Sequence, residues 1–145
     1  MLIKSGTTLL TVRRDSLYEG FERAELRLEA LRPPVSSFEA RFFADDPGAT
    51  AATAIVDNPH YLGSQFFYGL GVSDADANTD ARYDAGRESQ SAPTEIRVNI
   101  TTGICNYLKH GASEVFPITV IAVDRDGSEI AAPELDVEGV SLYIA

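Results

Sequence analysis

The amino-acid sequence predicts an all-β protein, an antiparallel β-sandwich of about seven or eight short strands with one short helix near residues 102–110. Two observations support this fold class. Charged and apolar residues alternate at period two in several short segments, as they do in strands with one buried face. Turn-forming residues at 45–48 and at Asp126 and Gly127 separate the apolar runs, which is typical of strands joined by hairpins and loops.

Residues 24–31 illustrate how the strands are assigned. Glu25, Arg27 and Glu29 alternate with Leu26 and Leu28, so the leucines share one face of an extended segment. Residues 17–31 also resemble an amphipathic helix, because Glu, Arg, Leu and Ala are all good helix formers. The strict period of two favours a strand.

The same reasoning applies along the chain. The predicted strands cover residues 8–14, 24–31, 37–44, 65–69, 94–100, 116–123 and 137–144. In residues 37–44, Phe42 is expected on the apolar face and Phe43 on the opposite, polar face. A short helix is expected after residue 100, with Thr101 or Thr102 as its N-terminal cap and Gly111 at its end.

Length and charge limit the possible functions. The 145 residues suffice for one domain spanning 1–145, and 12 Lys and Arg against 22 Asp and Glu give a net charge of −10. This acidic balance disfavours nucleic acid and anionic membrane surfaces as partners. No apolar run approaches the roughly 20 residues of a membrane span. The N-terminus does not resemble a secretory signal, so the cytoplasm is slightly favoured and the compartment stays open.

A possible cation site lies at Asp74, Asp76, Asn78 and Asp80, which alternate like the oxygen ligands that open a calcium-binding loop. The loop pattern fails further on, because Thr79 stands where the sharp turn needs glycine and no glutamate closes the loop. An ordinary solvated acidic loop within residues 73–93 is therefore the favoured interpretation.

A copper site is a second possibility. His60, Cys105 and His110 are the residue types of a blue-copper centre, and some cupredoxins space a Cys and a His as Cys105 and His110 are spaced. The axial methionine is missing, since Met1 is the only methionine. On a helix, Cys105 and His110 would also point to different faces. A packed Cys105 and two unrelated histidines are therefore favoured, and no cofactor is expected. A small electron-transfer copper protein that uses His60, Cys105 and His110 is the alternative hypothesis.

Nucleophilic catalysis is not expected either. It would need Cys105 beside a histidine and an orienting carboxylate, but Cys105 lies in the apolar stretch 103–108, which indicates burial and low reactivity. Adjacent carboxylates are frequent in so acidic a chain and carry little information. No catalytic residue is predicted, and the chain is not expected to be an enzyme.

Several separated segments, in this order, resemble a known family. They are FEARFFA at 38–44, DNPHYLGS at 57–64, FFYG at 66–69, the strand at 94–101, PITVIAVDRDG at 117–127 and VEGVSLY at 137–143. Together they resemble the C-terminal β-domain of tyrosinases and polyphenol oxidases. The resemblance covers residues 37–145 and leaves out residues 1–36, which are expected to add N-terminal strands.

This resemblance implies a shielding domain without its enzyme. In that family the C-terminal β-sandwich packs against a helical domain, whose six histidines hold two coppers, and covers its entrance. This chain has two histidines and too few residues for such a domain. A β-sandwich that displays aromatic side chains can instead present a binding face.

The predicted partner-binding residues are Tyr61, Phe67 and Tyr68, whereas alternation is expected to turn Phe66 into the core. The rigid turn at Asn58 and Pro59 should limit the entropy lost on docking. The leading hypothesis is a non-catalytic binding or assembly module. It would act as a detached partner subunit of a type-3 copper oxidase or as a self-associating structural subunit, a homo-oligomer in which the added strands of residues 1–36 pair across the interface.

Overall fold

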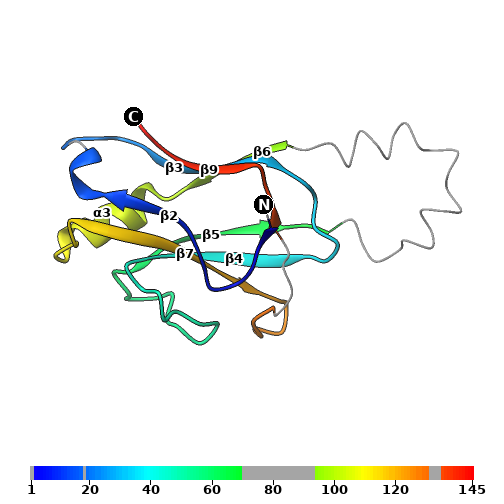
Figure 1. The fold of residues 1–145 in the computed structure, drawn as a ribbon. Coiled ribbons are helices and arrows are strands. Elements are labelled where there is room, and N and C mark those ends of the chain that lie inside the picture. Colours follow the sequence, from blue (N-terminus) through cyan, green and yellow to red (C-terminus); the bar gives the residue numbers. More distant parts are fainter. Residues whose placement is uncertain (1, 18, 70–93, 131–134) are drawn as a thin grey trace, which may run out of the picture.

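The computed structural model describes residues 2–17, 19–69, 94–130 and 135–145 as two layers of antiparallel strands (Figure 1). The first layer is a four-stranded sheet in the order β2 (Thr7–Arg13), β7 (Val115–Val123), β4 (Phe38–Ala44) and β5 (Tyr61–Phe67). The second is a three-stranded sheet in the order β6 (Thr94–Asn99), β3 (Ala24–Leu31) and β9 (Gly139–Ile144). A small ribbon pairs β1 (Leu2–Ile3) with β8 (Leu135–Asp136). The predicted all-β fold class is confirmed.

Two helical segments complete the described part of the chain: the 3-10 turn η1 (Arg14–Ser16) and the α-helix α3 (Thr101–Lys109). The expected cap of α3 was wrong. Ile100 occupies the cap position without a side-chain hydrogen bond, and the side chain of Asn99 accepts a bond from the Thr101 amide instead. Gly111 follows the helix at φ +85°, as its role as a terminator requires. No helix among the described residues is long and apolar enough to cross a membrane.

Apolar side chains from the facing sides of the two sheets form the main core. Phe38, Ala40 and Phe42 from β4 meet Leu26 and Leu28 from β3 in one buried cluster. The strands alternate as predicted on this side, because every second residue must point into the space between the sheets. Burial of these side chains removes them from water and stabilises the pairing of the layers.

The outer face of the four-stranded sheet is also partly buried. Phe43, Ile121 and Val123 point away from the main core and pack with Ala49 in a second apolar cluster. The loop between β4 and β5 makes this cover, and the Arg41 Nη1 atom ties it to the sheet by donating to the Ala51 carbonyl at 3.2 Å. Phe43 is therefore fully buried rather than on a polar face, because a loop covers the side that alternation alone assigns to solvent.

The helix α3 lies at one end of the sandwich, where it contacts β5 and β3 (Figure 1). Ile104 and Tyr107 are its buried side chains. Gly103 permits the close approach of the helix to β5, since a Cβ placed there would lie 2.2 Å from the Leu62 carbonyl oxygen. Only a residue without a side chain fits at this contact.

We predict that Gly103→Ala lowers the free energy of unfolding by about 1–3 kcal/mol, because the new Cβ must push the helix away from the backbone of β5. A decrease in stability would be informative, because Gly→Ala inside a helix otherwise raises the free energy of unfolding by roughly 1 kcal/mol. Gly48→Ala, whose Cβ meets nothing within 4 Å, is the matched control. Urea denaturation measures both variants, and a Gly103→Ala protein as stable as the control would contradict this packing.

Candidate binding surface

The part of the outer sheet face that the β4–β5 loop leaves uncovered forms a shallow groove of about 380 Å³. It lies across β4 and β5 and beside the turn that follows β7. The described residues that line it are Ser37, Phe38, Glu39, Arg41, Phe66, Phe67, Tyr68, Val123, Asp124, Arg125 and Gly127. We refer to this surface as the aromatic groove.

Two aromatic side chains of the groove are solvent-exposed. Phe66 at the end of β5 is 60% exposed, and Tyr68 just beyond it is 81% exposed. An aromatic side chain left in water at this extent forgoes the free energy of burial that most aromatic residues gain in a fold. The groove therefore offers apolar area to a partner.

The structure reverses the predicted orientation of Phe66 and Phe67. Phe67 is 5% exposed and stacks on Phe38 in the core, with ring centroids 5.3 Å apart, so the prediction that it contacts a partner was wrong. The register with β4 sets these directions, because Phe67 pairs with Phe38 on the core face and Phe66 pairs with Glu39 on the outer face. A bulge at Leu62, between the pairs Phe43–Tyr61 and Phe42–Gly63, places Phe67 on the face opposite Tyr61.

The other two predicted partner-binding residues have different positions. Tyr68 is the more exposed. Tyr61 is half-buried, packs on Phe43 with ring centroids 5.6 Å apart, and bonds through its hydroxyl to Ser64. Tyr61 therefore supports the cover of the outer sheet face, and Tyr68 is the predicted residue that the structure leaves free for contact.

An ion pair lies beside the exposed aromatics. Arg41 and Glu39 sit two residues apart on the outer face of β4, with Arg41 Nε donating to Glu39 Oε1 at 3.0 Å. Both side chains are largely buried, and Glu39 lies directly opposite Phe66 in the strand pairing. The groove thus combines exposed apolar side chains with a fixed polar pair.

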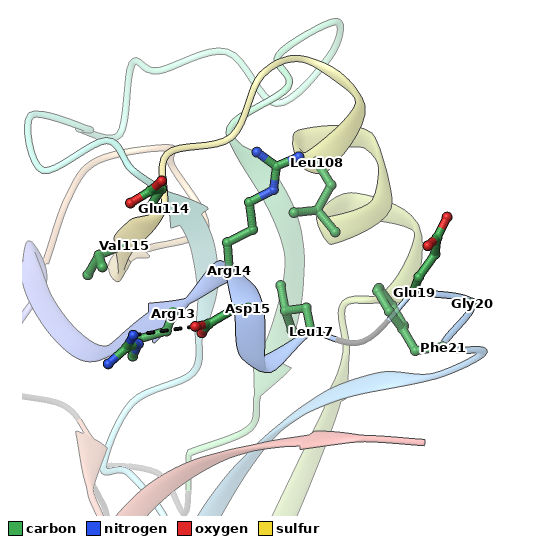
Figure 2. A pocket seen from close by; sticks show the side chains of 10 residues that line it. All are labelled: Arg13, Arg14, Asp15, Leu17, Glu19, Gly20, Phe21, Leu108, Glu114 and Val115. Carbon is green, nitrogen blue, oxygen red and sulfur yellow. Dashed lines mark hydrogen bonds and ion pairs between the residues drawn. The ribbon is translucent and has the colours of Figure 1, made fainter.

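Two other hollows are present among the described residues. The larger, of about 790 Å³, lies between η1, the end of α3 and the start of β7 (Figure 2). Figure 2 shows Arg14 reaching toward the helix near Leu108, and its Nη1 atom donates to the Ala112 carbonyl at 3.2 Å. Leu17, Phe21 and Leu108 line it with charged side chains around them, and its described lining contains no His or Cys.

The other hollow, of about 660 Å³, lies between residues 55–62 and α3. Cys105 and Lys109 line it from the helix. Cys105 is therefore half-exposed, and the expectation of a buried thiol was wrong, because the helix turns this position toward the hollow and Ile104 toward the core.

The residues of the alternative copper hypothesis do not come together. Among the described residues, no group of three His, Cys, Asp or Glu side chains is placed to hold a metal ion. His60 directs Nδ1 to the Ala44 carbonyl at 2.8 Å, and His110 directs Nδ1 to the Asn106 carbonyl of its own helix at 2.8 Å. The cation candidates Asp74, Asp76, Asn78 and Asp80 lie outside the described residues.

The structure brings together a polar cluster that the sequence analysis did not find. Tyr107 donates its hydroxyl proton to Asp45 at 3.0 Å, Ser113 donates to the same carboxylate at 2.7 Å, and the Ser113 amide donates to the tyrosine oxygen at 3.1 Å. Burial of the phenol, with Asp45 adding to the effect, raises the pKa of Tyr107 above its ordinary value of 10.0.

This cluster fastens the end of α3 to the end of β4. The only sequence signal was the turn at 45–48, since residues so far apart in sequence show no spacing pattern. Asp45 adopts φ +55°, a conformation that Asp tolerates better than most residues. Its bonds to Tyr107 and Ser113 make the arrangement a structural clamp.

Comparisons with known proteins find similarity at the level of the fold. No family model matches the chain, and no curated protein gives a significant match. The similar solved structures include three that cover 100% of this chain: latent aurone synthase (polyphenol oxidase) expressed recombinantly, the same enzyme co-crystallised with hexatungstotellurate(VI), and the enzyme from its natural source. Their identities are 11%, 9% and 12%, with TM-scores of 0.52, 0.54 and 0.52.

This chain spans about a quarter of those enzymes, 25%, 25% and 26% of their lengths. At such low identity the similarity shows a shared fold. The fold is that of one module of a larger polyphenol oxidase, in agreement with the resemblance noted in the sequence.

We predict that Tyr107→Phe lowers the free energy of unfolding by about 1–2 kcal/mol at pH 7, because the Asp45 carboxylate and the Ser113 amide each lose a partner. The raised pKa adds a pH signature. The stabilisation by the neutral phenol is complete below pH 10 and disappears as pH rises through the folded-state pKa.

The difference in stability between the wild type and Tyr107→Phe should therefore shrink in the alkaline range. Urea denaturation at several pH values, followed by circular dichroism, measures it. A difference that is absent at pH 7, or that grows at alkaline pH, would contradict the clamp.

Proposed function

We propose that this chain is a non-catalytic protein-binding module whose partner is the copper-binding domain of a type-3 copper oxidase. The observation that carries the proposal is the structural similarity over 100% of this chain to about a quarter of latent polyphenol oxidases. Those enzymes are described as latent, and a module that covers the entrance of a catalytic domain would account for latency. The binding function is inferred from this likeness together with the aromatic groove.

The aromatic groove supplies the contact surface in this proposal. Phe66 and Tyr68 supply apolar area at low entropic cost, since an aromatic side chain has two rotatable bonds. Aromatic residues in well-packed surroundings are among those that most often dominate the binding free energy of a protein interface. Phe67 and Phe38 stack beneath them and hold the end of β5 in place.

The ion pair of Arg41 and Glu39 adds oriented polar groups to this contact surface. Arg41 and Glu39 are already paired and largely desolvated, so a partner that covers them faces a smaller desolvation cost than with two free charges. Arg125 and Asp124 stand at the rim, where water still reaches them. This composition of apolar area and polar rim fits recognition of a folded protein better than chemical turnover.

We predict that replacing both exposed aromatics, Phe66→Ala with Tyr68→Ala, weakens binding to a polyphenol oxidase catalytic domain by about tenfold or more. The probe is a polyphenol oxidase from which the C-terminal domain has been removed, immobilised for biosensor measurements. The free energy of unfolding should change by less than about 0.5 kcal/mol, because both side chains are exposed.

Val115→Ala is the control, since it removes an exposed apolar side chain at the opposite end of β7. It should bind as the wild type does. A second readout is oxidation of a diphenol by the probe, which the wild-type chain should slow and the double variant should not. No binding of the wild type, or equal binding of the double variant, would refute the proposal.

A further inference from the structure

Strand β9 forms one edge of the three-stranded sheet, and the hydrogen bonds show which of its backbone groups are unused. Arg23 and Ala145 exchange both backbone bonds, at 3.1 and 3.0 Å, and such pairs alternate along an antiparallel ladder. The register with β3 then directs the N–H and C=O groups of Ser141 and Tyr143 toward β3. The corresponding groups of Val140, Leu142 and Ile144 point away from the sheet, and no described residue bonds to them. We call these groups the β9 edge.

The β9 edge lacks the protection that exposed strand edges usually carry. Its sequence GVSLYI has no charged residue and no proline. Strand β6, the opposite edge of the same sheet, carries Glu95 and Arg97. The ribbon partner β1 covers Leu135 and Asp136 and reaches no further along the chain. Within the described part of the chain, no strand pairs with residues 139–144 on this side, and they form an uncharged template for pairing.

The side chains of the edge are also incompletely buried. Val140, Leu142 and Ile144 pack against the main core but remain partly exposed. On the outer face, the Arg27 guanidinium lies 3.9 Å from the centroid of the Tyr143 ring and holds the ring in place. A strand added beside β9 would bury more of the three apolar side chains and satisfy the unused backbone groups.

We propose that β9 pairs antiparallel with β9 of a second copy of this chain, around a two-fold axis beside Leu142. The strand is self-complementary in this register. Val140 faces Ile144 of the second copy, Ile144 faces Val140, and the two Leu142 residues face each other. Each of these pairs exchanges two N–H···O bonds, so every open group of the edge is satisfied.

A second copy fits the edge because the pairing brings no like charges into contact. Ser141 lies opposite Tyr143 of the other copy, and the apolar side chains meet on the inner face. The two sheets join into one continuous sheet whose remaining edges are the charged β6 strands. The net charge of −10 on each copy still opposes association at long range. Salt should therefore strengthen the dimer, whereas it would weaken the binding of a basic partner.

We predict a dimer with about twice the 15.7 kDa mass of the chain in sedimentation velocity at tens of micromolar protein, favoured by added salt. Val140→Pro should raise the dimer dissociation constant by about tenfold or more, because it removes one intermolecular donor from each copy. No described residue of the same chain bonds to the Val140 amide, and prolines occur on strands where the amide faces solvent. Val140→Ala, which keeps the amide, is the matched control for the lost side chain.

Disulfide trapping tests the register without a proline. In a Cys105→Ser background, Leu142→Cys places two cysteines directly opposite each other, with Cα atoms about 5.5 Å apart. Ser141→Cys is the control, since the two copies of this residue lie on a diagonal at about 7–8 Å. Mild oxidation should link the Leu142→Cys chains and leave the Ser141→Cys chains unlinked.

A wild-type chain that stays monomeric at about 200 μM in added salt would overturn the inference, as would equal cross-linking of the two cysteine variants. The same holds for a dimer that Val140→Pro does not weaken. These results are separate from the oxidase test. A monomer that binds the oxidase domain refutes only the pairing, and a dimer that does not bind it refutes only the proposed function.

Discussion

One extra residue in β5 controls much of the architecture. Leu62 has no partner in β4, because Gly63 pairs with Phe42 and Tyr61 with Phe43. Tyr61 points outward onto the second apolar cluster and Leu62 into the main core, as alternation requires, and the bulge then keeps Gly63 on the core side as well, so that Phe67 rather than Phe66 faces the core. Bulges cost a regular pair of hydrogen bonds and gain a local change of side-chain direction. In β5, Leu62 and Phe67 pack into the main core, and Tyr61 packs on the second apolar cluster at the other face of the sheet.

The bulge also determines how the helix meets the sheet. The Leu62 backbone lies against Gly103, so the position of β5 and the absence of a side chain in α3 depend on each other. The helix end is fastened separately by Tyr107, Ser113 and Asp45. Two contacts, one steric and one polar, thus hold α3 across the end of the sandwich. Because the two contacts involve β5 and the end of β4, they also hold in place the strands that carry the aromatic groove.

The sequence predicts well a strand whose charged and apolar residues alternate. Strand β3 coincides with the predicted residues 24–31 for this reason, and Glu25 on its polar face is buried in ion pairs with Arg23 and Arg27. Strand β5 begins earlier than predicted, at Tyr61, and β1 and β8 have two residues each, too few to show a period. Periodicity detects a strand only when its length and its environment allow alternation.

The exposure of the predicted contact residues differs from the expectation in detail. Phe67 was expected to be exposed and Phe66 buried, yet the exposed ring is Phe66 and the buried ring is Phe67. A bulge leaves no signature in a single sequence, and a shift of one residue is enough to exchange the two faces. The burial of Phe43 and the cluster around Asp45 arise from a loop and a helix end that approach β4 in space. Contacts between distant segments are beyond what local patterns can predict.

The two proposed surfaces lie on opposite sides of the molecule and do not compete. The aromatic groove runs over β4 and β5, and β5 neighbours β6, whereas β9 neighbours β2 at the other side of the sandwich. A dimer joined through β9 would therefore leave both grooves open, each on a four-stranded sheet that packs against the joined three-stranded sheets. Two grooves with a fixed separation bind a partner array with higher avidity than one groove, provided that the spacing matches. Self-association and partner binding would then reinforce each other, because pairing at the β9 edge raises the effective concentration of the second groove once the first is occupied.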